Sequence, residues 1–229
     1  MAPLLLLPGL SNTPEIWDDV RAQLPVGIVC HALENATLED IDAIADEILA
    51  RAPPRFALAG FSFGGYVSLA IAAKAMDRIE RIALIATGAN ADSPEAAANR
   101  KRLIEIAQTD YPSIDGRVTK FVLHPDRVED AAIHDKRARM LREYGASRYI
   151  AQQRAAMARP ARDAVLASIR VPTLIAVGRE DKVTPLAQHE EMARRVPAAE
   201  LVVFEHCGHL APLEAPRELA QALTKWMTH

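Results

Sequence analysis

Short apolar runs that alternate with amphipathic helical stretches constrain the fold of this chain more than any other feature. Each run is brief and bounded by turn-forming residues, which favours a buried strand. Strands that alternate with helical stretches are typical of a parallel sheet whose strands are connected by helices. We therefore predict an α/β fold with six mostly parallel strands, at residues 4–7, 26–33, 55–59, 81–86, 171–177 and 200–204.

Apolar residues recur at helical spacing in the segments between these strands. This periodicity predicts flanking helices over residues 14–24, 37–48, 62–76, 185–196 and 212–227. Thr37 is the predicted N-cap of the second helix, because Asp40 follows three positions on and a stripe of isoleucines begins at Ile41.

The stretch from residue 92 to residue 167 breaks this alternation and contains no convincing strand. It is helical in pattern and longer than a crossover requires, so we predict a helical cap, or lid, after the fourth strand of a core formed by residues 1–91 and 168–229. Basic residues outnumber acidic ones between Arg100 and Asp163, whereas the rest of the chain is acidic. This asymmetry has two interpretations: a basic cap that favours an anionic substrate, or a solvated helix face.

Composition and charge exclude several classes of protein. The net charge of −3 lacks the basic footprint that nucleic-acid binders show. No apolar run approaches the roughly 18–20 residues that span a bilayer, and the apolar start of the chain lacks the basic segment of a signal peptide. We therefore expect a cytoplasmic protein that binds neither nucleic acid nor a membrane. Its 229 residues suit one domain.

The two cysteines, Cys30 and Cys207, are too few for a disulfide framework, and neither lies in a metal-binding spacing. We predict that both are buried small hydrophobic residues and that no metal is bound. Cys207 lies two residues before His209 and is an alternative nucleophile, but the sequence offers it no activating neighbour.

The segment Gly60-Phe61-Ser62-Phe63-Gly64 lies where the third predicted strand meets a helix. A turn this tight holds the serine in a strained backbone conformation and leaves no room for side chains at the flanking positions, which explains the glycines. The strain lifts Oγ of Ser62 clear of the sheet, beside a helix N-terminus that favours negative charge. The segment predicts a nucleophilic serine; the alternative is a glycine-rich turn used only for packing.

A serine hydroxyl needs a base before it can act as a nucleophile, and in sites built on this turn the acid and then the histidine follow in chain order. The loop after the fifth predicted strand offers Asp181 and its neighbour Glu180 as the acid. The loop after the sixth offers His209, and His206 is its rival, although His206 directly extends the strand. Because parallel strands place ligand sites at their carboxyl ends, we expect these groups to meet there.

An oxyanion hole is the remaining requirement of this chemistry. The N–H of Phe63, the residue after the serine, is one predicted donor. The N–H of Leu10, in the loop after the first strand, is the other, because Gly9 allows a close backbone approach there.

The segments Leu7-Pro-Gly-Leu, Gly60-Phe-Ser-Phe-Gly-Gly, the run from Pro172 to Asp181 and Gly208-His209 resemble the α/β-hydrolase superfamily. More narrowly, they are similar to small bacterial esterases, enol-lactonases and carbon–carbon bond hydrolases. The resemblance extends over nearly the whole chain and implies that Asp181 is the acid of the triad. In two respects the chain departs from the family. Pro8 stands where many members have a histidine that bonds to neighbouring backbone, and the chain starts at what is usually the third strand of the family.

These observations predict a hydrolase that cleaves carboxylic esters of small molecules through an acyl-enzyme on Ser62, without a cofactor. A lactonase, a thioesterase or a carbon–carbon bond hydrolase would use the same triad, and a ligand sensor of this fold would keep the triad without rapid turnover. The side chains predicted to line the substrate pocket are Tyr149, Ile150, Met157 and Leu210.

Overall fold

The computed structural model describes residues 2–197 and 199–228. These residues form one six-stranded sheet with the order β2-β1-β3-β4-β5-β6, in which every neighbouring pair is parallel. The prediction of six parallel strands is therefore confirmed. The strands are β1 (Leu4–Leu7), β2 (Cys30–Ala32), β3 (Phe56–Phe61), β4 (Ile79–Ile85), β5 (Thr173–Gly178) and β6 (Ala199–Phe204).

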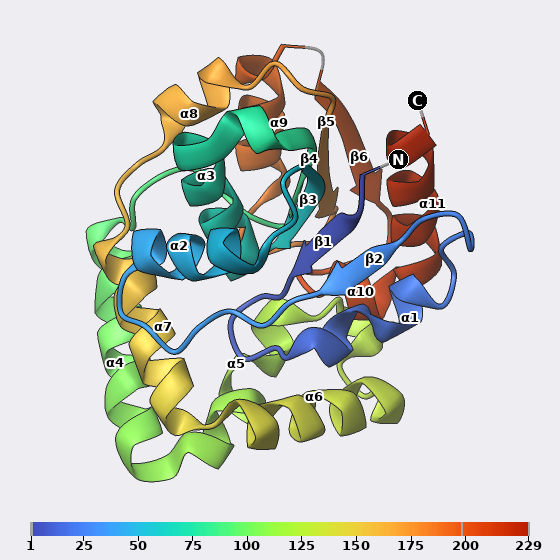
Figure 1. The fold of residues 1–229 in the computed structure, drawn as a ribbon. Helices are drawn as coiled ribbons and strands as arrows, with labels where there is room; N and C mark the ends of the chain where they lie inside the picture. Colours follow the sequence, from blue (N-terminus) through green and yellow to red (C-terminus); the bar gives the residue numbers. More distant parts are fainter. Residues whose placement is uncertain (1, 198, 229) are drawn as a thin grey trace.

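Helices cover both faces of the sheet (Figure 1). One layer contains α2 (Ile41–Arg51), α3 (Phe63–Ala75), α8 (Asp163–Ser168) and α9 (Leu186–Arg195). The other contains η1 (Pro14–Trp17), α1 (Asp18–Arg21), α10 (Ala211–Glu214) and α11 (Pro216–Thr228). Along β1, Leu4 and Leu6 face the second layer and Leu5 and Leu7 the first. Because both faces are buried, the strands are continuous apolar runs instead of alternating ones.

Two predicted elements differ clearly from the structure in their bounds. The second strand is confined to Cys30–Ala32, and Val26, expected within it, is fully exposed at 104%. This strand lies at the edge of the sheet and pairs only with β1, so the residues before it are not held in the sheet. The last predicted helix is split into α10 and α11, because Pro216 has no N–H to continue the hydrogen bonding.

The N-cap of α2 is Asp40 and not Thr37. Its Oδ1 accepts a hydrogen bond from the N–H of Ala43, at 2.8 Å. The cap therefore stands directly before Ile41, the first buried residue of the isoleucine stripe.

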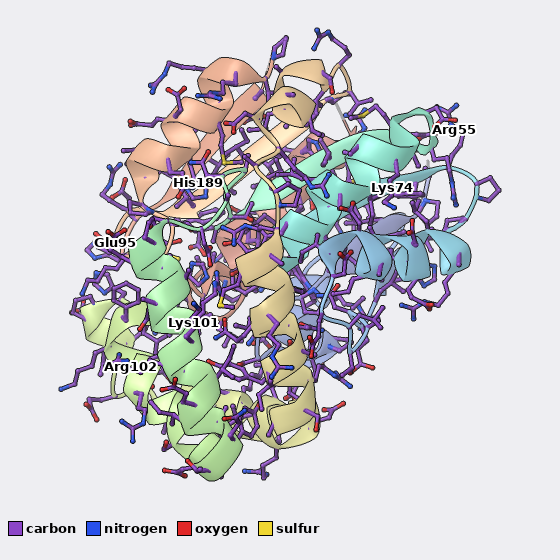
Figure 2. The ribbon with its side chains drawn as sticks, turned by 90° about the vertical axis from the view of Figure 1, so that its left-hand side faces the viewer. Arg55, Lys74, Glu95, Lys101, Arg102 and His189 are labelled. Carbon is purple, nitrogen blue, oxygen red and sulfur yellow. The ribbon has the colours of Figure 1, made fainter. Side chains whose placement is uncertain are left out.

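Five helices follow β4 before the chain returns to β5: α4 (Pro94–Asp110), α5 (Ile114–Val122), α6 (Ala131–Tyr144), α7 (Ala146–Ala158) and α8. As predicted, this stretch contains no strand among its described residues. Figure 2 shows α4 and α7 side by side, with Glu95, Lys101 and Arg102 along α4. Their shared apolar cluster is small and includes Leu103 and Tyr149. Within the described ranges, no helix has both the length and the apolar character that crossing a membrane requires.

Candidate active site

Ser62 lies at the junction between β3 and α3 with φ 51° and ψ −113°. Such a positive φ is strained for a residue with a side chain. Two contacts hold the backbone in place: the Ser62 N–H donates to the carbonyl of Ile85 at 2.8 Å, and the Thr87 hydroxyl donates to the carbonyl of Ser62 at 2.8 Å. The strained turn predicted from the sequence is present.

The glycines on either side of Ser62 are sterically required. A Cβ atom at Gly60 would lie 2.4 Å from the carbonyl oxygen of Gly64, and one at Gly64 would lie 2.4 Å from the carbonyl oxygen of Leu7. In both cases the obstacle is backbone, which cannot rotate away. The close approach of β1, β3 and α3 therefore depends on these two positions.

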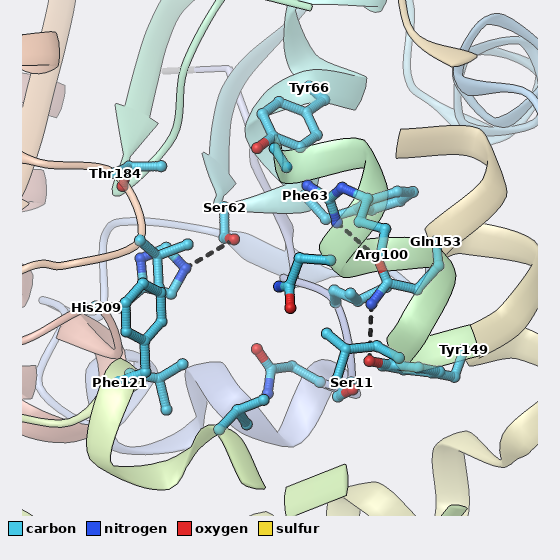
Figure 3. A pocket seen from close by; sticks show the side chains of 18 of the residues that line it. Ser11, Ser62, Phe63, Tyr66, Arg100, Phe121, Tyr149, Gln153, Thr184 and His209 are labelled. Atoms are coloured by element: carbon cyan, nitrogen blue, oxygen red, sulfur yellow. Dashed lines mark hydrogen bonds between the residues drawn. The ribbon is translucent and has the colours of Figure 1, made fainter. Parts of the chain in front are cut away.

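His209 connects the serine to a carboxylate. Its Nε2 lies 2.9 Å from Oγ of Ser62, and its Nδ1 lies 2.8 Å from Oδ2 of Asp181. Figure 3 shows the first of these bonds at the cavity. The three residues come from loops beyond the carboxyl ends of β3, β5 and β6, as expected for a parallel sheet.

Asp181 is buried and held by its own loop. Its Oδ1 accepts the N–H groups of Val183 and Thr184, at 2.8 and 2.9 Å, and its Oδ2 accepts the hydroxyl of Thr184 at 2.8 Å. Burial raises the pKa of Asp181, but the charge of His209 and these hydrogen bonds more than offset it, so the pKa lies below its usual value. An ionised carboxylate only accepts hydrogen bonds, so Nδ1 of His209 carries the proton and Nε2 faces the serine hydroxyl as an acceptor.

Neither rival residue joins this arrangement. The carboxylate of Glu180 accepts the N–H of Cys207 at 3.1 Å and lies 3.8 Å from Nε2 of His124, so it holds the neighbouring loop instead. His206 is exposed, has φ 53° and stacks edge-on against His124 at 5.7 Å. Among the described contacts, it is His209 that bonds to Ser62 and Asp181 that bonds to His209.

Cys207 is completely buried, as predicted, whereas Cys30 is only half-buried on the edge strand. Burial raises the pKa of the Cys207 thiol, and the nearby Glu214, Asp181 and Glu180 raise it further. A protonated, inaccessible thiol is a poor nucleophile. Its burial and raised pKa therefore argue against Cys207 as the nucleophile.

Glu214 is a residue that the sequence reasoning missed. Its buried carboxylate accepts three backbone N–H groups, those of His124, Gly208 and Leu210, at 2.7, 3.1 and 2.9 Å. Gly208 and Leu210 flank His209, so this one side chain fixes the loop that carries His209. Burial raises the pKa of Glu214, although the three N–H groups act in the opposite direction. The available signal was an acidic residue within the apolar run from Leu210 to Ala215.

The loop after β1 has Pro8 at the position where the resemblance implies a histidine, and it is held from another side. Nδ2 of the buried Asn35 donates to the carbonyl of Pro8 at 2.9 Å. The predicted oxyanion donors, Leu10 and Phe63, both lie at the same cavity as Ser62. As the first residue of α3, Phe63 has no acceptor for its N–H within the helix.

The serine and the histidine open into a cavity of about 550 Å³ between the sheet and α4, α5 and α7. Of the predicted pocket residues, Tyr149 and Leu210 line it. Ile150 and Met157, which were also predicted, are not among the residues that line it. A helix turns by about 100° per residue, which rotates Ile150 off the face of α7 that Tyr149 and Gln153 present to the cavity. Met157, four residues after Gln153, lies about one turn further along the helix.

One cluster among the described residues has the composition of a metal site. His124, Asp126 and His206 place potential ligand atoms within 4.8 Å of one another. Nδ1 of His124 already accepts the N–H of Asp126 at 3.1 Å, which engages this nitrogen. The cluster adjoins Glu180 through His124, and its three residues are not among those that line the cavity with Ser62.

Comparisons with known proteins agree with this geometry. The model of the Alpha/beta hydrolase family matches residues 4–222, and the chain belongs to this family. The chain is 28% identical over 246 residues to a pimeloyl-acyl-carrier-protein methyl ester esterase of Aromatoleum aromaticum, covering 95% of this chain and 94% of that protein. The protein of the same name in Nitrosomonas europaea is 24% identical over 230 residues, covering 94% and 91%.

Solved structures confirm the predicted α/β-hydrolase fold. A thermophilic esterase from Thermogutta terrifontis superposes with a TM-score of 0.88 at 26% identity, covering 99% of this chain and 89% of the esterase. The enol-lactonase from Burkholderia xenovorans superposes with a TM-score of 0.89 at 21% identity, covering 100% and 92%.

Proposed function

We propose that the chain is a serine hydrolase that cleaves carboxylic esters of small molecules, with Ser62 as nucleophile, His209 as general base and Asp181 as the acid that orients the histidine. One observation carries the proposal: a single imidazole bonds to the Ser62 hydroxyl on one side and to a buried, ionised carboxylate on the other. Relatives named as methyl ester esterases over nearly the full chain support the same class of substrate.

The reaction proceeds in two halves. Nε2 of His209 takes the proton of Ser62 as Oγ attacks the ester carbonyl, and the N–H groups of Leu10 and Phe63 stabilise the oxyanion. The intermediate collapses, the alcohol leaves with the proton from His209, and the acyl group remains on Ser62. Water then gives a proton to His209 and attacks the acyl carbonyl. The acid leaves and the proton returns to Oγ.

We also propose that residues 92–167 act as a cap over a core of residues 1–91 and 168–229. The support is that α4 and α7 contribute Arg100, Tyr149 and Gln153 to the cavity that contains Ser62. These three side chains of the cap would therefore face the substrate without being part of the proposed triad.

The test is turnover of p-nitrophenyl esters of increasing acyl length, together with a lactone and a thioester, by the wild type and by Ser62→Ala. The expected loss in kcat for the variant is at least about 1,000-fold. Ser168→Ala, an exposed serine on α8, is the matched control and keeps its activity. Near-normal turnover by Ser62→Ala contradicts the mechanism. A stoichiometric burst without further turnover by the wild type identifies a ligand sensor instead.

A further inference from the structure

The wall of the cavity carries more positive than negative charge. The charged side chains that line it are Asp92, Arg100, Asp115, Arg137 and Arg159. Arg137 and Asp115 form a close pair, with Nη2 2.7 Å from Oδ1, and cancel each other. The other three consist of two guanidiniums and one carboxylate, which leaves one net positive charge.

Asp92 cannot neutralise both of its partners. Nε of Arg100 lies 2.6 Å from its Oδ2, and Nη1 of Arg159 lies 2.5 Å from its Oδ1. The Asp92 side chain is only 4% exposed, so both contacts are shielded from water. Arg159 is further held over the ring of Tyr66, at 3.9 Å from the centroid. A charge excess that is this poorly hydrated is stabilised when an anion enters the cavity.

Arg100 has donor capacity that the protein does not use. Its Nη1 donates to Oε1 of Gln153 at 2.7 Å and its Nε to Asp92, while no hydrogen bond within the described residues takes Nη2. Burial lowers the pKa of Arg100, but nearby Tyr66 and Asp92 raise it by more, so the guanidinium stays charged. A guanidinium has five N–H donors in a planar fork, which suits a carboxylate.

The hydroxyl of Tyr149 is a second available donor. Because the carbonyl oxygen of Gln153 faces Arg100, its amide nitrogen donates to the Tyr149 hydroxyl, at 2.7 Å. The hydroxyl therefore accepts from Gln153 and keeps its own hydrogen for another partner. Burial raises the pKa of Tyr149, which keeps that hydrogen in place. In the view of Figure 3, Arg100, Gln153 and Tyr149 lie on one side of the cavity and His209 on the other, with Ser62 between them.

We propose that Arg100 and Tyr149 form a carboxylate subsite, and that the preferred substrates are esters with a free carboxylate at the end remote from the scissile bond, as in monoesters of linear dicarboxylic acids. This inference rests on the proposed ester hydrolysis at Ser62. The carboxylate accepts from Nη2 of Arg100 and from the Tyr149 hydroxyl, and it compensates the excess charge around Asp92. The ester carbonyl then lies at the opposite side of the cavity, beside Ser62 and His209.

The test compares monomethyl with dimethyl esters of the same linear dicarboxylic acids, from succinic to suberic acid. The wild type is expected to prefer the monomethyl ester at the chain length that spans the cavity. Hydrogen bonds to charged groups predict that Arg100→Met lowers kcat/KM for that monoester about 10- to 100-fold more than for its dimethyl ester, mainly through KM. Arg100→Lys is expected to restore part of the loss, and Tyr149→Phe to cause a smaller one.

Arg102→Met is the matched control, because Arg102 lies on the exposed face of the same helix (Figure 2). It removes the same charge and leaves the ester preference unchanged. Binding of the free dicarboxylate to Ser62→Ala, measured by calorimetry, gives a readout independent of turnover, and its affinity is expected to fall about 10-fold when Arg100→Met is added.

One outcome would contradict the carboxylate subsite alone, and another would contradict the proposed ester hydrolysis as well. If the wild type cleaves monomethyl and dimethyl esters equally at every length, or Arg100→Met and Tyr149→Phe affect both alike, the carboxylate subsite is wrong and ester hydrolysis stands. If the wild type cleaves neither ester faster than Ser62→Ala does, the proposed function is wrong and the subsite falls with it.

Discussion

The core and the helical insertion hold their charged side chains in opposite ways. Around the triad, Asp181 and Glu214 are buried and bonded to backbone N–H groups. The insertion is instead joined to residues 1–91 by ion pairs, and in each of them the basic residue belongs to the insertion. Most of these side chains remain in contact with water. The pairs are Lys136–Asp19, Arg139–Glu15, Arg148–Glu34, Arg154–Glu39 and Arg162–Asp42.

This difference explains the charge asymmetry of the sequence. Much of the basic excess of the insertion pairs with acidic residues of the core instead of facing a substrate. Arg137 and Asp115 cancel each other at the cavity, so the net charge that faces it comes from the group around Asp92. Buried contacts to backbone fix the geometry of the core, whereas exposed pairs attach the insertion with small and screened contributions.

The largest effect, on turnover, is expected from substitution of Asp181, the acid proposed to orient His209. Asp181→Asn removes the charge that selects the histidine tautomer, and kcat is expected to fall about 1,000- to 10,000-fold. Glu180→Gln is the control, one residue away, and is expected to lower kcat less than about 10-fold, because its carboxylate bonds to the loop and not to His209. A greater loss from Glu180→Gln would reverse the assignment.

An intermediate effect, on stability, is expected when His189 in the buried core is protonated. Nε2 of His189 accepts the N–H of Thr87 at 3.0 Å, and burial lowers the pKa of His189 to about 4 from its usual 6.5. Above pH 6.5 neither state binds the proton, and below that value the unfolded chain binds it first. The free energy of unfolding therefore falls by about 3 kcal/mol as the pH drops from 6.5 to 4.

Urea unfolding across this pH range measures the effect. His189→Gln lacks the titrating group and is expected to be less stable at neutral pH but to lose less stability on acidification. Equal pH slopes in the variant and the wild type would show that His189 does not carry this dependence. Added salt is expected to change the slope little, because the group is buried.

The smallest effect is expected at the exposed pairs of the insertion. Arg154→Met removes the pair with Glu39, whose side chains are 45% and 56% exposed, and is expected to cost less than about 1 kcal/mol. Lys101→Met on the exposed surface of α4 is its control. Hydrogen exchange of α6 and α7 is expected to accelerate in salt while that of β3 does not. Equal acceleration in the sheet would remove the distinction between the two regions.

Most of the core was predictable because its signals are local. The four leucines of β1 and the glycines around Ser62 form short patterns that can be recognised within a few residues of sequence, and these patterns predicted both the parallel sheet and the strained turn. The edge strand was overestimated because Val26 has an apolar side chain but no partner strand. On α7, periodicity could not say which face meets the cavity, and the structure places Tyr149 but not Ile150 in its lining.

By itself, therefore, the sequence determined the sheet, the order of the triad residues and the serine turn, since each depends on spacing along the chain. Only the tertiary structure decided that Asp181 and not Glu180 bonds to His209, that Asn35 supports the loop at Pro8, and that Glu214 holds the base loop from a position 90 residues from one of its donors. The tertiary structure alone also showed that the Nη2 donors of Arg100 are not used within the described residues. Such contacts join segments that have no periodic relation, and they exist only once the helices have docked on the sheet.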